Sequence, residues 1–293
     1  MLDSVKSVLV RRFIYIAVIL AVFIPLAFKF SIVPARLKSA ERIKSLVEAL
    51  PADSFGMLFF DFGPSTRAEN EPQAEVILEH LLRRRVKVAI FTLLPLAEGF
   101  LKSVPERVIK RLEAEMPGEK WKYGVDWINM GYRIGDSLFL QGLAKSENIP
   151  KYLGKDFSGL RVSDLEVFSK VKTLRDVSIV GQFSGVVGIF DSYMQFLQQA
   201  GYIPTIIHGC TSITIPEAYI YLDSGQLKGI LEGLSGAAWY SKLLKDTFEK
   251  REPDQALLSN TALGISQLLV LILIALGNLN MFFHKRGAVD GMG

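Results

Sequence analysis

Cysteine, histidine and clustered positive charge are scarce in this sequence. A single cysteine, Cys210, among 293 residues excludes an internal disulfide and a thiolate-rich zinc site built by one chain. The three histidines have no spacing that requires a metal ion, and we expect neither a metal site nor a cofactor. The 34 basic and 30 acidic residues are spread along the chain without a Lys/Arg tract, so we do not expect nucleic acid as a partner.

Charge is also missing from two long apolar stretches, one near each end. Residues 261–283 are 23 residues without a charge, and residues 13–28 are apolar, with broken apolar character up to residue 33. About 20 apolar residues cross a hydrocarbon layer as a helix. For the first stretch, Pro34 and the lack of a clear A-x-A site favour an uncleaved anchor over a cleaved signal peptide. We predict transmembrane helices over residues 13–33 and 261–283, with the lipid bilayer as a partner.

The charges that flank these stretches predict the membrane topology. Basic residues lie on both sides of the first stretch in nearly equal number, whereas residues 284–286, His-Lys-Arg, directly follow the second. The approach to the second stretch is net acidic between residues 246 and 254. Since positive residues favour the cytoplasmic side, we predict a cell-membrane protein. Both tails, residues 1–12 and 284–293, would be cytoplasmic, and the intervening domain would be extracytoplasmic.

Between the two stretches, the patterning predicts one α/β domain. Residues 34–50 have a basic amphipathic pattern and are expected to form a connecting helix that ends at Pro51. The domain would then span residues 51–246, followed by a linker over 247–260. Apolar residues 55–62 and 86–94 predict buried strands, separated by a helix with Asn70 as its cap and Pro72 in its first turn. A second helix is predicted over residues 97–115.

This β-α-β-α order is typical of a parallel sheet. Residues 176–183 and 203–208 predict two further strands, joined by a helix over 187–200 that ends at Gly201. Residues 121–130 and 137–140 have strand-like content, and residues 147–170 are too irregular to classify. The expected fold is therefore a membrane-anchored, mainly parallel sheet with flanking helices, a Rossmann-like three-layer arrangement.

Residues 224–244 contain small residues at spacings of three and four, which predict a helix with one side nearly bare of side chains. Interior glycines cost a helix about 1 kcal/mol each relative to alanine, so close backbone approach should compensate for them. This side could pack flush on the sheet. Alternatively, it could form an interface between protomers or with a partner subunit, through Gly225, Gly229, Gly233, Gly236 and Ala237.

Ligands of open parallel sheets bind beyond the carboxyl ends of the strands. The polar residues that follow the predicted strands are therefore the candidates for a site. For ligand binding they are Ser65, Thr66, Asp126, Gln182, Thr211 and Ser212, and for catalysis they are Asp61, Ser184, His208 and Cys210.

Neither catalytic pattern is specific. An imidazole near Cys210 could lower the pKa of the thiol, but His208 lies only two residues away in the same segment. Ser184 misses the G-x-S-x-G nucleophile elbow by one position, and a helix cap explains it equally well. Residues 121–132 also hold an aromatic group, Trp121, Tyr123, Trp127 and Tyr132, which could stack on a sugar or a nucleobase or simply pack at a sheet edge.

No stretch of the sequence identifies a family of known activity. Its paired anchors and its lack of catalytic signatures favour a membrane-tethered binding or scaffold domain. Such a domain would belong to a larger membrane assembly, as a homo-oligomer or with other membrane-protein subunits. The alternative is a membrane-bound hydrolase with its site at the carboxyl ends of the strands. Whether the chain is an enzyme stays open at this level.

Overall fold

A computed structural model of the chain describes residues 2–197 and 202–290. It divides into two compact units. The first comprises Met1–Pro34 with Pro253–Gly293, and the second comprises Ala35–Glu252.

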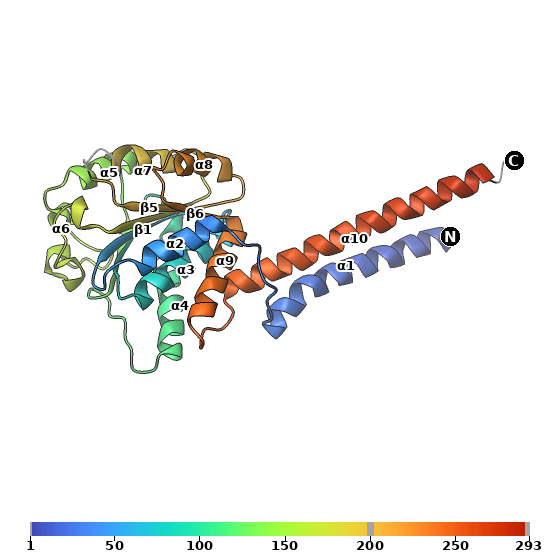
Figure 1. The fold of residues 1–293 in the computed structure, drawn as a ribbon, viewed down its shortest axis with the longest axis horizontal. Helices are drawn as coiled ribbons and strands as arrows, with labels where there is room; N and C mark the ends of the chain where they lie inside the picture. The colour runs from blue at the N-terminus through green and yellow to red at the C-terminus, as the bar shows by residue number, and fades with distance from the viewer. Residues whose placement is uncertain (1, 198–201, 291–293) are drawn as a thin grey trace. The chain divides into compact units, whose positions relative to one another are not determined.

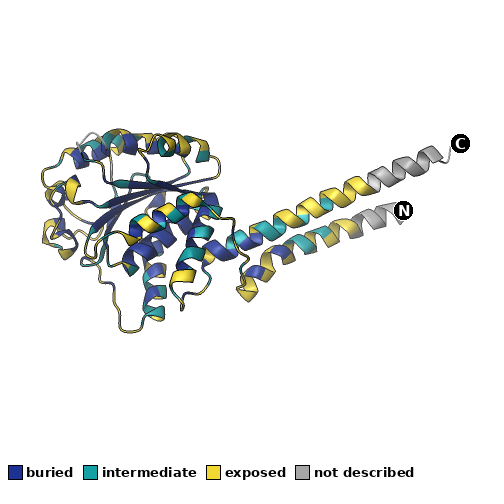
Figure 2. Ribbon diagram, in the orientation of Figure 1, coloured by how far each residue is buried: buried dark blue, intermediate teal, exposed yellow. Residues whose placement is uncertain are grey.

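The first unit is a pair of long helices, α1 (Leu2–Phe28) and α10 (Gln255–Asp290). They run side by side in opposite directions, so that the amino end of α1 and the carboxyl end of α10 lie at the same end of the pair (Figure 1). Four residues after the end of α1, the Ile32 N–H donates a hydrogen bond to Thr261 Oγ1 of α10 at 3.1 Å. Val10–Phe28 and Gln255–Leu279 are each long and apolar enough to cross a membrane, and most of their side chains are not buried (Figure 2).

An apolar helix at each end of the chain was predicted, and the structure contains both. Their bounds differ from the prediction. The first helix ends at Phe28 and not at residue 33, and residues 30–37 form neither a helix nor a strand. The second begins at Gln255, within the predicted linker, and continues through residues predicted as a tail. Membrane insertion and topology stay predictions.

The second unit contains a six-stranded parallel sheet with the strand order β3-β2-β1-β4-β5-β6. The strands are β1 (Phe55–Asp61), β2 (Lys87–Thr92), β3 (Trp127–Tyr132), β4 (Ile179–Ser184), β5 (Thr205–Cys210) and β6 (Gly229–Glu232). From β1 the chain builds outward to β2 and β3, then returns to the other side of β1 to add β4, β5 and β6. The order therefore reverses between β1 and β4, the position at which doubly wound sheets bind their ligands.

Helices cover both faces of this sheet, as the three-layer prediction requires (Figure 1). One face carries α2 (Lys38–Glu48), α3 (Arg67–Arg83), α4 (Phe100–Glu115) and α9 (Gly233–Thr247). The other carries α5 (Asp136–Lys145), α7 (Ile189–Leu197) and α8 (Ile215–Asp223), and the short α6 (Ile149–Leu153) follows α5.

The central strand β1 is buried along its whole length because it has helices above and below it. Alternate side chains point to opposite faces. Phe59 meets Tyr193 of α7 edge-on at 5.0 Å between ring centroids. On the other face, Phe60 packs against Phe62, which in turn contacts Phe100 of α4. This is the apolar run that predicted the strand.

The predicted glycine-lined helix over residues 224–244 is wrong. Residues 224–228 form a turn, β6 follows, and α9 begins only at Gly233. Gly225 has a φ of +75° in that turn, where a side chain would be strained. A Cβ on Gly229 would lie 2.4 Å from Ile43 of α2, and one on Gly236 would lie 2.7 Å from the backbone of Leu231. These glycines serve turns and close packing inside the unit, and the five proposed interface residues do not share one helix face.

Two further local predictions differ from the structure, and one helix was missed. Helix α3 begins at Arg67, so Asn70 is a buried helical residue and not the cap. Residues 137–140 belong to helix α5, not to a strand. Helix α8 was not predicted, because Pro216 and short apolar spacing obscured it. The predicted helix stop at Gly201 lies outside the described residues.

Candidate functional site

Five loops meet at the carboxyl edge of the sheet. They are residues 62–66 after β1, 93–99 after β2, 133–135 after β3, 185–188 after β4 and 211–214 after β5. All strands are parallel, so all five loops leave the sheet at the same edge. The loops after β1 and β4 flank the point at which the strand order reverses.

The loops pack closely around Gly185. A Cβ on this residue would lie 2.4 Å from Thr211 Cγ2 and 2.6 Å from Thr66 Cγ2, so only glycine allows the three loops to converge. Next to them, a Cβ on Gly63 would lie 3.8 Å from Leu96 Cβ. The loop after β1 is therefore in contact with the loops after β2, β4 and β5.

Asp61, the last residue of β1, lies below these loops as a buried carboxylate. Its oxygens accept hydrogen bonds from Leu93 N at 2.8 Å, Gln182 Nε2 at 3.1 Å, Tyr193 Oη at 2.5 Å and Thr92 Oγ1 at 3.3 Å. Burial raises the pKa of Asp61, and the hydrogen bonds oppose that rise. These four donors are uncharged, and through them the Asp61 carboxylate links β1 to β2, β4 and α7.

His208 is held as a neutral imidazole in β5. Its ring stacks on Phe190 of α7 with 4.1 Å between centroids, and its Nδ1 lies 3.0 Å from the carbonyl oxygen of Gln182. A carbonyl oxygen can only accept, so Nδ1 carries the hydrogen. Burial lowers the pKa of His208 to about 4.

The two candidate nucleophiles are buried and already hydrogen-bonded. The Cys210 thiol donates to the Leu231 carbonyl at 3.5 Å, and burial raises its pKa to about 12. Ser184 Oγ accepts a hydrogen bond from Val186 N–H at 3.0 Å. Within residues 2–197 and 202–290, no hydrogen bond joins either side chain to His208. The structure brings these residues to one edge without forming a nucleophile–base pair, and their catalytic role stays a prediction.

The predicted ligand-binding residues divide between two edges of the sheet. Ser65 is exposed, Thr66 and Thr211 contact the Gly185 position, and Ser212 donates from N and Oγ to Glu69 Oε2 at 2.9 and 2.6 Å. Gln182 is buried beneath the same loops.

Asp126, by contrast, was wrongly placed after a strand. Residues 121–126 form a turn, and Asp126 precedes β3, where it accepts from Lys122 N at 2.7 Å. It therefore lies at the amino edge of the sheet.

Sequence reasoning missed the aliphatic side chains of these loops. Six of them are between 42% and 85% exposed, and they come from the loops after β2, β3, β4 and β5 and from the first turn of α5. We call this set the aliphatic rim: Leu96, Ile134, Leu138, Val186, Val187 and Ile213. The detectable signal was a large apolar residue inside a loop, as in the Gly-Val-Val-Gly sequence of residues 185–188.

The loops that carry the rim contain almost no charge. Only Glu98 and Arg133 are ionisable in the five loops. Arg133 is turned to backbone carbonyls, donating to Leu153 O at 3.1 Å and to Lys155 O at 2.7 Å. The five loops therefore present mainly aliphatic and uncharged polar groups, while Asp136 at the start of α5 and Glu217 of α8, which accepts from Gly188 N at 3.0 Å, lie beside them.

A second missed feature is the polar attachment of β5 and β6 to α3. Gln73 Nε2 donates to three carbonyls at the ends of these strands, those of Cys210, Leu231 and Gly233, at 2.8, 3.0 and 2.9 Å. Asn70 Nδ2 adds a bond to Gly209 O at 3.1 Å. These amides fix the strand ends from which the loop after β5 departs.

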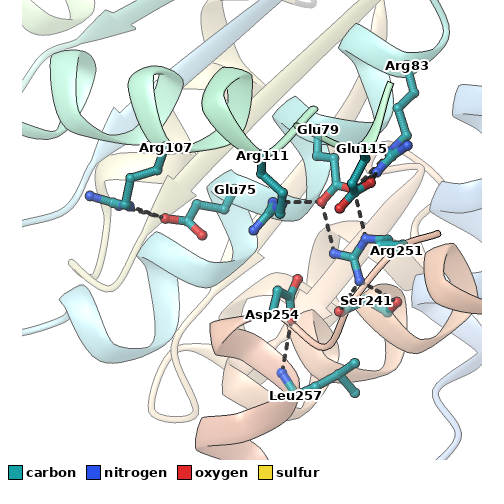
Figure 3. A network of polar contacts seen from close by, with 10 residues as sticks. All are labelled: Glu75, Glu79, Arg83, Arg107, Arg111, Glu115, Ser241, Arg251, Asp254 and Leu257. Atoms are coloured by element: carbon teal, nitrogen blue, oxygen red, sulfur yellow. Dashed lines mark hydrogen bonds and ion pairs between the residues drawn. The ribbon is translucent and has the colours of Figure 1, made fainter. Parts of the chain in front are cut away.

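Helix α3 also anchors a buried network of ion pairs (Figure 3). Glu79 is fully buried and contacts three arginines: Arg83, Arg111 and Arg251. Although burial alone would raise its pKa, the arginines, led by Arg251, lower it to about 2. One turn earlier, Glu75 pairs with Arg107 at 2.6 Å. Because each charge faces an opposite one, the network holds α3, α4 and the end of the second unit together.

Comparisons with known proteins identify no family. The chain matches no protein-family model and no curated protein. One solved structure aligns with it, a substrate-binding protein of a sugar ABC transport system from Bordetella parapertussis, at 12% identity over 73% of this chain and 86% of that one. The TM-score is 0.18, so the alignment carries no argument about the fold or the function of this chain.

Proposed function

We propose that this chain is a membrane-tethered scaffold whose α/β unit binds a second copy of itself through the aliphatic rim. The observation that carries the proposal is the concentration of exposed aliphatic side chains on and beside five loops that contain only two ionisable residues. Single exposed apolar residues are normal on protein surfaces, whereas groups of them mark interaction sites. Burying each valine, leucine or isoleucine side chain contributes about 1.5–3 kcal/mol, so several together can drive association.

The lack of charge supports a second copy as the occupant. In a two-fold symmetric contact the same surface patch is used by both subunits, and a patch with charge of one sign would repel its twin. An anionic lipid surface would instead be expected to contact clustered Lys and Arg, which the five loops lack. Two candidate membrane helices would also hold copies in one plane and raise their effective concentration.

Binding is favoured over hydrolysis by the state of the candidate catalytic residues. Ser184, His208 and Cys210 are buried and engaged with backbone groups or a neighbouring ring, and the Cys210 pKa of about 12 leaves little thiolate at neutral pH. The aliphatic side chains of the rim, by contrast, face solvent at this edge.

The test is the mass of the full-length protein in mild detergent, measured by light scattering during size-exclusion chromatography. Wild-type protein should form a dimer, and Val187→Asp with Ile213→Asp should convert it to a monomer with an unchanged unfolding temperature. The matched control is Ile203→Asp, because Ile203 is 48% exposed and precedes β5 at the opposite edge of the sheet. Monomeric wild-type protein, or rim variants that dimerise like the control, would refute the proposal. If one copy of the chain is instead found in complex with a different subunit, the partner is that subunit and not a second copy.

A further inference from the structure

A shallow, open cleft of about 350 Å³ lies on the second unit, away from the carboxyl edge. Its aromatic wall is Trp121, Tyr123 and Trp127, from the segment that enters β3 at the amino edge of the sheet. Its polar wall comes from α4, through Glu106, Lys110 and Glu113. The volume is within the range of small-molecule sites.

Hydrogen bonds hold the polar atoms of two aromatic residues of this wall, Tyr123 and Trp121. Tyr123 Oη donates to Asp156 Oδ2 at 2.6 Å, and burial together with this carboxylate raises the Tyr123 pKa to about 12. Trp121 Nε1–H donates to Leu82 O at 3.0 Å. Tyr123 and Trp127 meet edge-to-face, with centroids 5.0 Å apart and planes at 90°. Although its hydroxyl is engaged, Tyr123 is 37% exposed, so its ring surface is what the cleft presents.

The polar wall offers both acceptors and donors. Glu106, Lys110 and Glu113 lie on successive turns of α4, and Glu113 pairs with Lys120 at 3.0 Å. The two glutamates and one lysine that line the cleft carry a net charge of −1, and Lys120, which pairs with Glu113 from outside the lining, brings the sum of the four to zero. Carboxylates accept hydrogen bonds from hydroxyl groups, and ammonium groups donate to them.

We propose that this cleft binds a neutral saccharide. The aliphatic C–H face of a sugar ring would lie on the exposed Tyr123 ring, and its hydroxyl groups would bond with Glu106, Lys110 and Glu113. A nucleotide would stack equally well, but its phosphates would face two carboxylates. A quaternary ammonium group would face Lys110. The balanced charge and the aromatic wall together therefore select a flat, uncharged, hydroxyl-rich ligand.

The experiment is a fluorescence titration of the full-length protein with cellotriose, maltotriose and chitotriose. Two of the chain's three tryptophans line the cleft, so intrinsic fluorescence reports on its occupancy. A polyoxyethylene detergent is required, because the headgroup of a maltoside detergent is itself a saccharide. At least one trisaccharide should produce a saturable change. Tyr123→Ala should weaken that binding about tenfold, through the lost ring contact.

Two further variants separate binding from folding. Tyr123→Ala also removes a partner of Asp156, so Glu106→Gln provides a second test with an exposed side chain, and it should weaken the same trisaccharide several-fold. Tyr219→Ala is the matched control, because Tyr219 is 39% exposed on α8, outside the cleft, and affinity should stay at the wild-type value. The proposal is overturned if no trisaccharide gives a saturable change, if both cleft variants bind like wild type, or if adenosine monophosphate or choline binds the cleft and the saccharides do not.

Discussion

Replacing Glu79 by glutamine should destabilise the α/β unit far more than the same replacement of Glu75, one turn earlier on α3. The Glu79 side chain is fully buried. Its carboxylate accepts hydrogen bonds from Arg251, which is also fully buried, at 2.7 and 2.9 Å, and from Arg111 at 2.7 Å. Glutamine preserves the shape but removes the negative charge. The charge-charge contacts of Glu79 with Arg251 and Arg111 would then be lost.

The pKa of Glu79 gives the magnitude. The native state lowers it from 4.5 to about 2, which corresponds to about 3 kcal/mol of stability at neutral pH. Loss of one partner from a buried ion pair costs about 3–5 kcal/mol, in agreement with this value. For Glu75→Gln the expected cost is below about 1 kcal/mol, because Arg107 keeps its contact with Glu71 and the Arg107 side chain is 44% exposed.

Thermal unfolding in detergent, followed by circular dichroism, tests this difference. A loss of 3–5 kcal/mol should lower the midpoint by about 6–20 °C in a unit of this size, and Glu75→Gln by no more than about 4 °C. Because the native pKa is depressed, the contribution of Glu79 is complete above pH 4.5 and is lost as the pH falls toward 2. That acid-dependent loss should be smaller in Glu79→Gln. Equal midpoints for the two variants would refute the reasoning.

Three further predictions concern the candidate site and the core. Gly185→Ala should lower the free energy of unfolding in urea by about 1–3 kcal/mol, because the new Cβ meets two threonine methyl groups. Gly99→Ala, with open space around it, should be nearly neutral. Equal effects of the two substitutions would contradict the loop packing. His80 and His208 have native pKa values lowered to about 4. As the pH falls from 6.5 to 4, protonation of the unfolded chain should therefore lower the free energy of unfolding by up to about 3 kcal/mol for each histidine. NMR titration of the folded protein tests this, and a pKa near 6.5 for either ring would disprove it. Cys210 should react with maleimide at neutral pH only after denaturation, and rapid labelling of the folded protein would contradict its burial and raised pKa.

The strands were predictable where a strand is buried on both faces. Residues 55–62 form a continuous apolar run, and β1 has helices on each side, so composition and environment agree. The glycine spacing of residues 224–244 was misleading because intervals of three and four imitate a helix. The parallel pairing of Ile207 with Gly229, which makes β6 a strand, is a long-range contact that the local pattern does not contain.

The position of the site was easier to predict than its chemistry. Alternating strands and helices place the loops at one edge, and Ser184, His208 and Cys210 do lie there. Their burial depends on packing from α3, α7 and α8, which the sequence of the loops does not specify. The ion network, too, could be predicted only in part. The spacing of Glu75 and Glu79 is visible in the sequence, but their partners on α4 lie 32 residues away along the chain.

The strand order also determines when β1 can be completed during synthesis. Gly56 pairs with Val88 on one side, but its partner on the other side is Ile179, 123 residues later. Until β4 has emerged from the ribosome, one edge of the most apolar strand in the sheet has no partner. Open, apolar strand edges are sites of aggregation, and long-range parallel pairing is slow. This protein therefore carries its greatest risk of misfolding in the middle of translation, before the second half of the sheet exists.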